Sequence, residues 1–397
     1  MTLLAGSLSR LLNPKIEAAG LEIGTSAIKV VELRPGNPPG LVSFGMRPMP
    51  PGLVQEDQVV DPDGLAEEIK ALYKEAEISK RFVVTAVSNR LAIVRNIQIP
   101  KMNEKELDEA IKWEAERYIP FPIDEVTLDY YVLDNPDDID DDGGQLEVVI
   151  AAARLDLVTQ QMEYLKSAGL EPVVIDIKSF ALMRSLRAGL LGDAISRTSL
   201  TGQSYQDDED VNVILEIAAA NTSITLLRND RLLMNRNIGV SGDDFTSAIQ
   251  RAFGLDFDTA ESVKLDYGTA VIPDEVDDEE ELLNFDARRE QYSPGKVYEA
   301  LRPVLVDLTT EIRRSLEFFR VQAGDVEIGR MVLTGGGAKL PGLAEAISDT
   351  LEFRVEVADP WASLNVDRDK FDLAYLQSMS GEFGVPLGLA MRGVDLD

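Results

Sequence analysis

One short pattern occurs twice in this chain of 397 residues, with roughly half the chain between the copies. Leu21-Glu22-Ile23 leads into Gly24-Thr25-Ser26, and Leu215-Glu216-Ile217 leads into three alanines at 218–220. Each copy predicts a strand that ends in an acidic residue and an isoleucine, then a tight turn and a second strand. Because a repeat describes architecture rather than a single site, we expect an α/β protein with two similar halves.

Length and composition limit the classes of protein that remain. At about 150 residues per domain, the chain has room for two or three domains. The net charge is −31, from 39 basic and 70 acidic residues, which disfavours direct binding to nucleic acid or anionic lipid. The chain has no Cys and no His, which excludes disulfides, thiolate metal sites, most zinc sites and the usual Ser-His-Asp triad. Any chemistry must use carboxylates, hydroxyls, Lys, Arg and backbone amides.

The sequence gives no sign of membrane insertion. No segment approaches the ~20 consecutive apolar residues that span a bilayer. Met1–Lys15 contains five leucines, but it lacks the basic start and the long apolar core of a secretion signal. Its leucines either dock on the rest of the protein or form a short amphipathic helix at a membrane surface. The cytosol is the simplest compartment.

Acidic runs divide the chain into segments with regular patterns. Asp134–Asp142, Asp207–Asp210 and Asp274–Glu281 are expected to be solvated loops or linkers. Strands are predicted within Gly20–Leu33 and at Phe82–Ser88, Leu91–Ile99, Gln145–Ala153, Pro172–Ile177, Val211–Ile217, Ser223–Arg228, Leu232–Ile238 and Met331–Thr334. Helices are predicted at Asp61–Glu77, Asn103–Tyr118 with a capping box at Asn103 and Glu106, Leu155–Ala168, Phe180–Leu191, Asp243–Ala252, from Ser293 with a kink at Pro303, and at Leu340–Leu351.

Five segments of the chain follow the order found in the actin/Hsp70/sugar-kinase ATPase fold. The chain resembles this fold over nearly its whole length. The five segments are a first phosphate turn at Glu22–Lys29, a connecting strand at Val174–Asp176, a second phosphate turn at Glu216–Thr222, an adenosine glycine loop at Thr334–Gly337 and a closing helix at Pro386–Met391. The resemblance implies two lobes, each with a mixed sheet and helices, and a nucleotide cleft between them.

Within this superfamily the chain is most similar to the PilM family, the actin-like cytoplasmic component of type IV pilus assembly, which is related to FtsA. The similarity depends on Gly20–Lys29, Trp113–Glu125, Ile175–Ala181 and Gly335–Leu343. It implies a first lobe core (1A) at 1–88 and 171–200 with an inserted FtsA-type subdomain (1C) at 89–170. The second lobe would have its core (2A) at 205–252 and 326–397 and a helical subdomain (2B) at 253–325.

The resemblance assigns residues to a nucleotide site. Backbone amides and hydroxyls can replace water around phosphate oxygens, a role that suits Gly24, Thr25 and Ser26 on one side and Asn221 and Thr222 on the other. Lys29 either neutralises phosphate charge or points outward from its strand. Gly335, Gly336 and Gly337 either approach the adenosine or only form a tight turn. Glu261 and Lys264 match a segment that contacts ribose and adenine, although alone they are an ordinary surface pair, and Lys339 is assigned to the same side.

Three carboxylates would hold hydrated Mg²⁺ and orient water in such a site. They are Glu22, Asp176 and Glu216. Relatives commonly have Asp at the first and third positions, and the longer Glu shifts the carboxylate by about 1 Å, which matters for in-line attack. Alanine at 218–220 resists positive φ and fills space beside the phosphates. We therefore expect binding of ATP with Mg²⁺ and weak or no ATPase activity, for which the missing His is no obstacle.

The resemblance also implies partners. The expected ligand is the N-terminal cytoplasmic tail of a PilN-type inner-membrane protein, bound as an ordered peptide between the first lobe and the inserted subdomain. Pilus motor ATPases and self-association are further expectations, with a peripheral place at the inner membrane and roles in twitching motility and natural transformation. Trp113 lies off the apolar face of its predicted helix, so it either packs on a neighbouring element or anchors a partner.

Two alternatives share the fold. A small-molecule kinase would need a substrate pocket and a catalytic acid, and no polar cluster outside the phosphate turns supplies them. An FtsA-like cell-division protein usually ends in a basic amphipathic helix, whereas this chain ends in the short acidic segment Met391–Asp397. A nucleotide-binding scaffold is the leading hypothesis.

Overall fold

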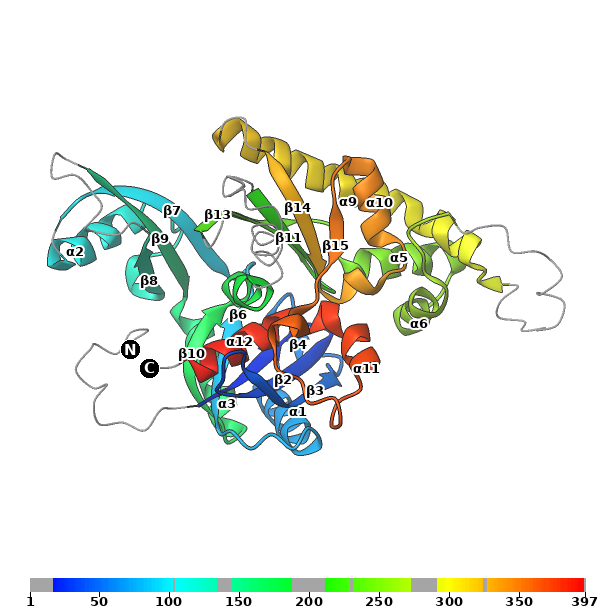
Figure 1. Ribbon diagram of the computed structural model, residues 1–397, viewed down its shortest axis with the longest axis horizontal. Helices are drawn as coiled ribbons and strands as arrows, with labels where there is room; N and C mark the ends of the chain where they lie inside the picture. The colour runs from blue at the N-terminus through cyan, green and yellow to red at the C-terminus, as the bar shows by residue number, and fades with distance from the viewer. Residues whose placement is uncertain are drawn as a thin grey trace, which may run out of the picture.

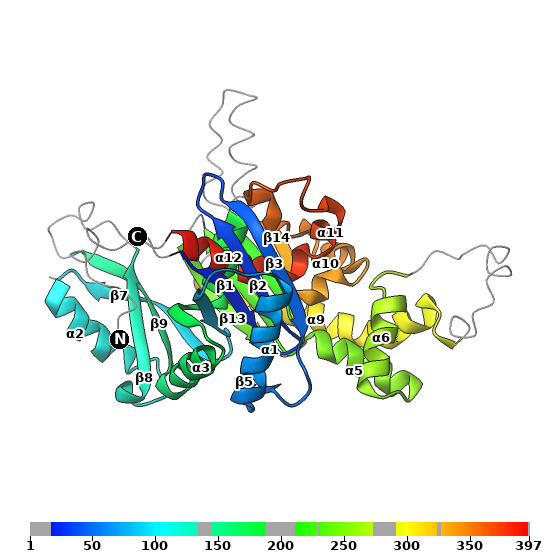
Figure 2. The same ribbon diagram turned by 90° about the horizontal axis from the view of Figure 1, so that it is seen from below.

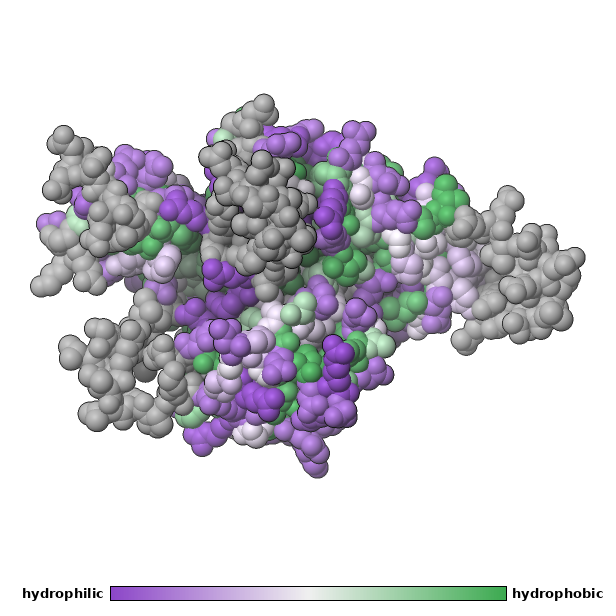
Figure 3. Space-filling model, viewed as in Figure 1, coloured by the Kyte–Doolittle hydropathy of each residue, from purple (hydrophilic) through white to green (hydrophobic). Residues whose placement is uncertain are grey.

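The computed structural model describes residues 17–102, 104–133, 144–187, 211–228, 231–272, 291–323 and 327–395 (Figure 1). Several sequence predictions lie outside these residues, namely those for Met1–Lys15, Asn103, the end of the helix predicted at Phe180–Leu191 and the three acidic runs. On the face seen in Figure 3, hydrophilic side chains predominate and hydrophobic ones form small separate groups. Among the described residues, no helix has both the length and the apolar character needed to cross a membrane.

The first lobe is built on a five-stranded mixed sheet. β1 (Ala19–Ile23), β2 (Ala27–Arg34) and β3 (Gly40–Pro48) form an antiparallel meander. β6 (Phe82–Val87) and β10 (Glu171–Ile177) extend the sheet in parallel on the other side of β1. The strand order is therefore β3-β2-β1-β6-β10, with the first copy of the repeated pattern at its centre.

The second lobe repeats this topology. β11 (Val211–Ile217), β12 (Thr222–Arg228) and β13 (Arg231–Ile238) form the antiparallel meander. β14 (Ile328–Thr334) and β15 (Val355–Val357) add in parallel beyond β11, which gives the order β13-β12-β11-β14-β15. The two sheets match strand for strand, so the duplication predicted from sequence is confirmed.

Two helices cover the outer face of the first sheet. α1 (Pro62–Glu75) begins at Asp61, whose carboxylate accepts the Gly64 N–H, and buries its apolar side against β1 and β2. α3 (Leu155–Ser167) lies in the range first assigned to the inserted subdomain, but Tyr164 and Leu165 belong to the core of the first lobe. We therefore propose that the insertion ends near the start of α3. The subdomain division otherwise remains a prediction.

The two lobes are joined by helices between their sheets. α12 (Gly384–Val394) and the helical residues 178–187 share one apolar cluster with both sheets, including Val84, Ile214 and Leu389 (Figure 1). α12 lies so close to β1 that a Cβ added at Gly20 would be 2.2 Å from the carbonyl oxygen of Pro386. This close packing requires glycine at position 20.

The first lobe carries an insertion with no counterpart among the described residues of the second lobe. β7 (Ala92–Pro100), β8 (Val126–Val132) and β9 (Gln145–Arg154) form an antiparallel sheet in the order β7-β9-β8. α2 (Glu104–Ala115) covers it and is followed by the 3-10 turn η1 (Ile123–Glu125). Figures 1 and 2 place this unit at the opposite end of the molecule from α5 and α6.

Trp113 on α2 does not pack on a neighbouring element. Its side chain is 73% exposed, whereas Ile111 on the same helix is 1% exposed. The packed interpretation is therefore wrong, because the helix turns Ile111 toward the three-stranded sheet and Trp113 away from it.

Helices surround the second sheet. α5 (Gly242–Phe253) starts with a capping box between Ser241 and Asp244, and α6 (Phe257–Tyr267) packs on it. α9 (Pro294–Ala323) is a single helix through Pro303. The remaining elements are β4 (Val54–Gln55), β5 (Gln58–Val59), η3 (Gly336–Lys339), α10 (Leu343–Leu351), η4 (Pro360–Ser363), α11 (Leu373–Ser378) and η5 (Ser380–Glu382).

Candidate functional site

The two repeated turns have the same backbone geometry. In the first, the Gly24 N–H donates to the carbonyl oxygen of Ala27 at 3.0 Å, and in the second the Ala218 N–H donates to that of Asn221 at 2.9 Å. The described alanines at 218–220 do not have positive φ, so the conformation does not strain them. This agrees with the expectation that alanine resists positive φ, and the expected filling of space beside the phosphates remains a prediction.

The three predicted carboxylates are buried at the ends of three strands. Glu22 is 5% exposed on β1, Asp176 is 9% exposed on β10 and Glu216 is 6% exposed on β11. A buried carboxylate needs a cation or several hydrogen bonds to remain ionised at low cost. The partners of each carboxylate therefore determine what this site can bind.

Two lysines hold Glu22. Lys178, the residue directly after β10, places Nζ 2.9 Å from Glu22 Oε1, and Lys29 places Nζ 3.4 Å from Glu22 Oε2. The Lys29 side chain is only 12% exposed, so the outward-pointing interpretation of this residue is wrong. Sequence reasoning missed Lys178, although it lies inside the segment Ile175–Ala181 and two residues after Asp176.

The surroundings of Glu22 and Glu216 shift the pKa values of these two carboxyl groups in opposite directions. Burial alone would raise the pKa of Glu22, but Lys178 and Lys29 lower it below its ordinary value. Burial raises the pKa of Glu216, and the attraction of Lys178 only partly opposes this rise. Burial alone would lower the pKa of Lys178, but the carboxylates of Glu22 and Glu216 raise it, with a smaller contribution from Asp57. Lys178 therefore stays charged between the two lobes.

Asp176 is held by a different cation. Its Oδ2 accepts a hydrogen bond from Arg184 at 3.1 Å, and Arg184 also donates to the carbonyl oxygen of Gly388 on α12 at 2.8 Å. The carboxylate is thus tied to the connection between the lobes. In the described part of the chain, no group of three or more acidic side chains is arranged to hold a metal ion. The predicted carboxylates, as arranged here, are not placed to ligate a divalent ion directly, and a hydrated Mg²⁺ held through water remains a prediction.

Asn89 bridges the lobes beside these carboxylates, and sequence reasoning also missed it. Its Nδ2 donates to Ser223 Oγ at 3.2 Å, and Ser223 Oγ donates to Glu216 Oε2 at 3.1 Å. Its Oδ1 accepts the Ser179 N–H at 3.0 Å. One amide side chain therefore connects the end of the β6 segment, the residues after β10 and the second turn.

Buried hydroxyls around Asn89 lack partners. Thr222 Oγ1, Ser88 Oγ and Ser179 Oγ are buried, with no hydrogen-bond partner among the described residues. An unsatisfied buried polar atom costs about 1–3 kcal/mol and usually indicates a missing water or ligand. Unpartnered donors beside the second turn suit a polar ligand such as phosphate.

The glycine loop after β14 packs against the second turn. Gly335 has a φ of 84°, and an added Cβ would lie 2.3 Å from the carbonyl oxygen of Ile217. At Gly337 an added Cβ would lie 2.4 Å from Ile217 Cγ2, whereas Gly336 has open space. Two of the glycines are thus needed to pack the loop on β11, and Gly336 is free to face a ligand. Lys339 forms a 3.0 Å ion pair with Glu382.

The Glu261–Lys264 pair connects two helices. Glu261 Oε2 and Lys264 Nζ, both on α6, are 2.6 Å apart. Lys264 also donates to Thr246 Oγ1 on α5 at 2.7 Å. The first residue of α5, Gly242, donates its N–H to the carbonyl oxygen of Ala218. The pair therefore supports the helix that adjoins the second turn, and its contact with ribose remains a prediction.

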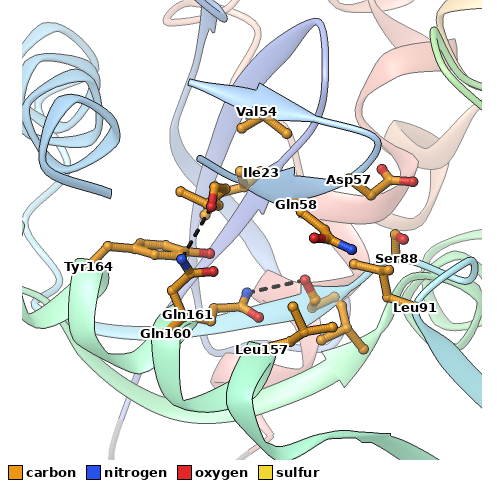
Figure 4. Close-up of a pocket in the computed structure, with 13 residues that line it drawn as sticks. Ile23, Val54, Asp57, Gln58, Ser88, Leu91, Leu157, Gln160, Gln161 and Tyr164 are labelled. Atoms are coloured by element: carbon orange, nitrogen blue, oxygen red, sulfur yellow. Dashed lines mark hydrogen bonds between the residues drawn. The ribbon is translucent and has the colours of Figure 1, made fainter. Parts of the chain in front are cut away.

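A separate pocket lies in the first lobe, where the chain enters the insertion (Figure 4). The β4–β5 hairpin, the end of β6 and α3 enclose a cavity of about 50 Å³. Its wall is partly apolar, with Val54, Leu91 and Leu157, and partly polar, with Gln58 and Gln160. Trp113 is not among the residues that line it.

The duplicated sheets, the helices between them and the two facing turns define the actin-like fold. The fold is shared with the ethanolamine utilization protein EutJ from Carboxydothermus hydrogenoformans, at a TM-score of 0.52 and 14% identity over 96% of this chain and 90% of that one. The family model for the type IV pilus assembly protein PilM matches residues 20–284 and 277–394, so this chain belongs to the PilM family.

Two further relatives agree with this assignment. A solved structure of a PilM-PilN type IV pilus biogenesis complex contains a chain 45% identical to this one, with a TM-score of 0.81. That match covers 96% of this chain and 99% of the other. The cell division protein FtsA of Bacillus subtilis is 23% identical over 366 residues, which covers 86% of this chain and 78% of FtsA. The predicted family and fold are thus confirmed.

Proposed function

We propose that this protein is an ATP-binding scaffold of type IV pilus assembly that binds the N-terminal tail of a PilN-type inner-membrane protein. The observation that carries the proposal is the 45% identity, over almost the full length of both chains, to the PilM-PilN complex. The absence of a membrane-crossing helix among the described residues makes the partner the route to the membrane in this proposal.

The cleft between the lobes supports the nucleotide part of the proposal. Gly24, Thr25 and Ser26 from the first turn, with Asn221 and Thr222 from the second, would surround the phosphates. Lys29 would add positive charge, and Glu261, Lys264 and the loop at 335–339 would lie toward the adenosine. When bound, ATP would supply a phosphoanhydride for hydrolysis. The ion pairs of Glu22 and Asp176 leave neither carboxylate free to orient water, so turnover is expected to be weak or absent.

Thermal unfolding with and without ATP tests the nucleotide site. A ligand that binds only the folded state raises the melting temperature by mass action. We expect a rise with millimolar ATP and a smaller one with adenosine. No rise under any ionic condition would contradict ATP binding, and turnover of many molecules per second would contradict the slow-hydrolysis part.

The pocket in the first lobe, where the chain enters the insertion, supports the tail part of the proposal. An extended peptide needs one or two apolar anchors and polar partners for its backbone, and this wall offers both. Asp57 Oδ2 lies there buried, with no hydrogen-bond partner among the described residues. A basic tail would suit this carboxylate and the acidic protein as a whole.

A matched pair of variants on α3 tests this docking site. Leu157 lines the pocket, whereas Leu155 is 46% exposed and is not among the lining residues. We expect Leu157→Ala to weaken the tail peptide by about 1 kcal/mol and Leu155→Ala to leave its affinity unchanged, measured by calorimetry. If Trp113→Ala weakens binding and Leu157→Ala does not, the tail docks on α2 instead.

Flotation with liposomes tests the route to the membrane. The net charge of −31 opposes attachment to anionic lipid. We expect the protein to float only when the tail is displayed on the liposomes. Flotation without the tail would point to Met1–Lys15 as an anchor.

Interactions with motor ATPases and self-association remain predictions. Roles in twitching motility and natural transformation also remain predictions.

A further inference from the structure

Lys178 lies where carboxylates from the two lobes approach each other. Its Nζ is 2.9 Å from Glu22 Oε1 in the first lobe, and Glu216 of the second lobe is close enough to interact with it electrostatically. Lys178 is 8% exposed, and both glutamates are less exposed than that. The three side chains come from the ends of β10, β1 and β11, which are distant in sequence.

Two carboxylates buried this close to one another require a positive charge between them. Like charges repel strongly away from water, and an uncompensated buried charge costs several kcal/mol. A divalent ion is one way to supply that charge, and a lysine ammonium, a compact point charge on a flexible stem, is another. The described residues contain a lysine in this place and no acidic cluster arranged for a metal ion.

Arg184 plays the corresponding part for the third carboxylate. It neutralises Asp176 at 3.1 Å, and Lys29 adds a second positive charge on the far side of Glu22 at 3.4 Å. Two of the three carboxylates assigned to magnesium, Glu22 and Asp176, thus form ion pairs with cations of the protein itself.

We infer that Lys178 is a built-in cation of the cleft, which takes the place of a protein-held divalent ion and lets ATP phosphates bind without one. This inference rests on the proposed ATP binding and specifies its ionic requirement. It departs from the expectation, drawn from the family resemblance, that ATP binding depends on Mg²⁺. Lys178 is accordingly a positioning residue that holds the buried Glu22 in an ion pair beside the proposed phosphate site.

Calorimetric titration of the full chain with ATP, in excess EDTA and in excess MgCl₂, tests the inference. We expect the two affinities of the unaltered protein to agree within about tenfold, or about 1.4 kcal/mol. ATP binding only with Mg²⁺ would overturn the inference and leave the proposed nucleotide site standing. No binding in either buffer would overturn both.

Lys178→Met keeps the length of the side chain and removes its charge. We expect this variant to need Mg²⁺, with affinity more than tenfold higher in MgCl₂ than in EDTA. We also expect Mg²⁺ without nucleotide to raise its melting temperature and to leave that of the unaltered protein unchanged. A Lys178→Met variant with the same Mg²⁺ independence as the unaltered protein would overturn the inference.

Two further variants control for folding and for charge in general. If Lys178→Met fails to fold, Lys178→Gln removes the charge but keeps a hydrogen-bond donor for Glu22, and we expect the same Mg²⁺ requirement. Lys29→Met removes the other lysine on Glu22. We expect Lys29→Met to weaken ATP binding in both buffers by a similar factor. A Mg²⁺ requirement in Lys29→Met as strong as that of Lys178→Met would overturn the assignment to Lys178.

Discussion

The two lobes carry the same hairpin with different residues opposite its glutamate. In the first lobe Glu22 pairs across the strands with Lys29, and in the second lobe Glu216 pairs at the same position with Ser223. The pKa of Glu22 is lowered by its two lysines, whereas burial raises the pKa of Glu216. The duplicated backbone thus does not duplicate the charges, because the cations of the cleft come from the first lobe.

The largest loss of stability should come from substituting Glu22, the glutamate of the first lobe. Glu22→Gln leaves Lys178 and Lys29 without their ionised partner in a buried site. We expect a loss of about 3 kcal/mol in the free energy of unfolding, measured in urea at pH 7. Glu216→Gln is the matched control, and its stability should be unchanged or higher. Equal losses from the two substitutions would show that the lobes do not differ in this way.

A second difference lies at the ends of the strands next to the hairpins. β6 ends near Ser88 and Asn89, whereas β14 ends in the glycines that press against Ile217. Gly335→Ala would strain a positive φ and place a Cβ against backbone, so we expect a loss of about 2 kcal/mol. Gly336→Ala has open space and should change stability by less than about 0.5 kcal/mol in the same urea experiment. Similar losses at both positions would contradict the packing described for this loop.

The pH dependence of stability should separate the two glutamates. A raised pKa, as for Glu216, means that stability present below the ordinary value of 4.5 is lost as the pH rises. The stability of Glu216→Gln relative to that of the unaltered protein should therefore increase as the pH rises from 4 to 7. The lowered pKa of Glu22 means that its stabilisation exists above 4.5 and is lost as the pH falls. The loss of stability caused by Glu22→Gln should accordingly become smaller toward pH 4. If the stability of the two variants changes with pH in parallel, both pKa directions are contradicted.

The smallest effect is expected in the insertion, which only the first lobe has. Trp113 is 73% exposed, so Trp113→Ala should change the free energy of unfolding by less than about 0.5 kcal/mol. Ile111→Ala on the same helix should cost about 3 kcal/mol because Ile111 is buried under the three-stranded sheet. A large loss from Trp113→Ala would restore the packed interpretation of this residue.

Local patterns in the sequence were enough to predict the main elements of the fold. The paired motifs at Leu21–Ile23 and Leu215–Ile217 identified the two central strands, and the turns that follow them fell where predicted. The glycine loop after β14 was also found, because a run of glycines is read from neighbouring residues, whereas the helix α12 was expected from the family resemblance. The family resemblance then supplied the order of the lobes.

The sequence could not predict which charges meet inside the cleft. Lys178 and Glu22 are 156 positions apart, and Asn89 reaches Ser223 across 134 positions. Strand and turn signals extend over only a few residues, so they do not show which strand ends packing will bring together. The same limit applied to Trp113, whose exposure depended on where the sheet of the insertion lies.

The sequence by itself therefore determined the duplicated α/β architecture and the family. The tertiary structure alone decided that two of the three carboxylates assigned to a metal, Glu22 and Asp176, form ion pairs with Lys178, Lys29 and Arg184. The physical reason is that strand and turn formation depends on local backbone preference and the alternation of side chains. The ionisation of a buried carboxylate depends instead on burial and on cations within a few ångströms, which only the folded chain brings together.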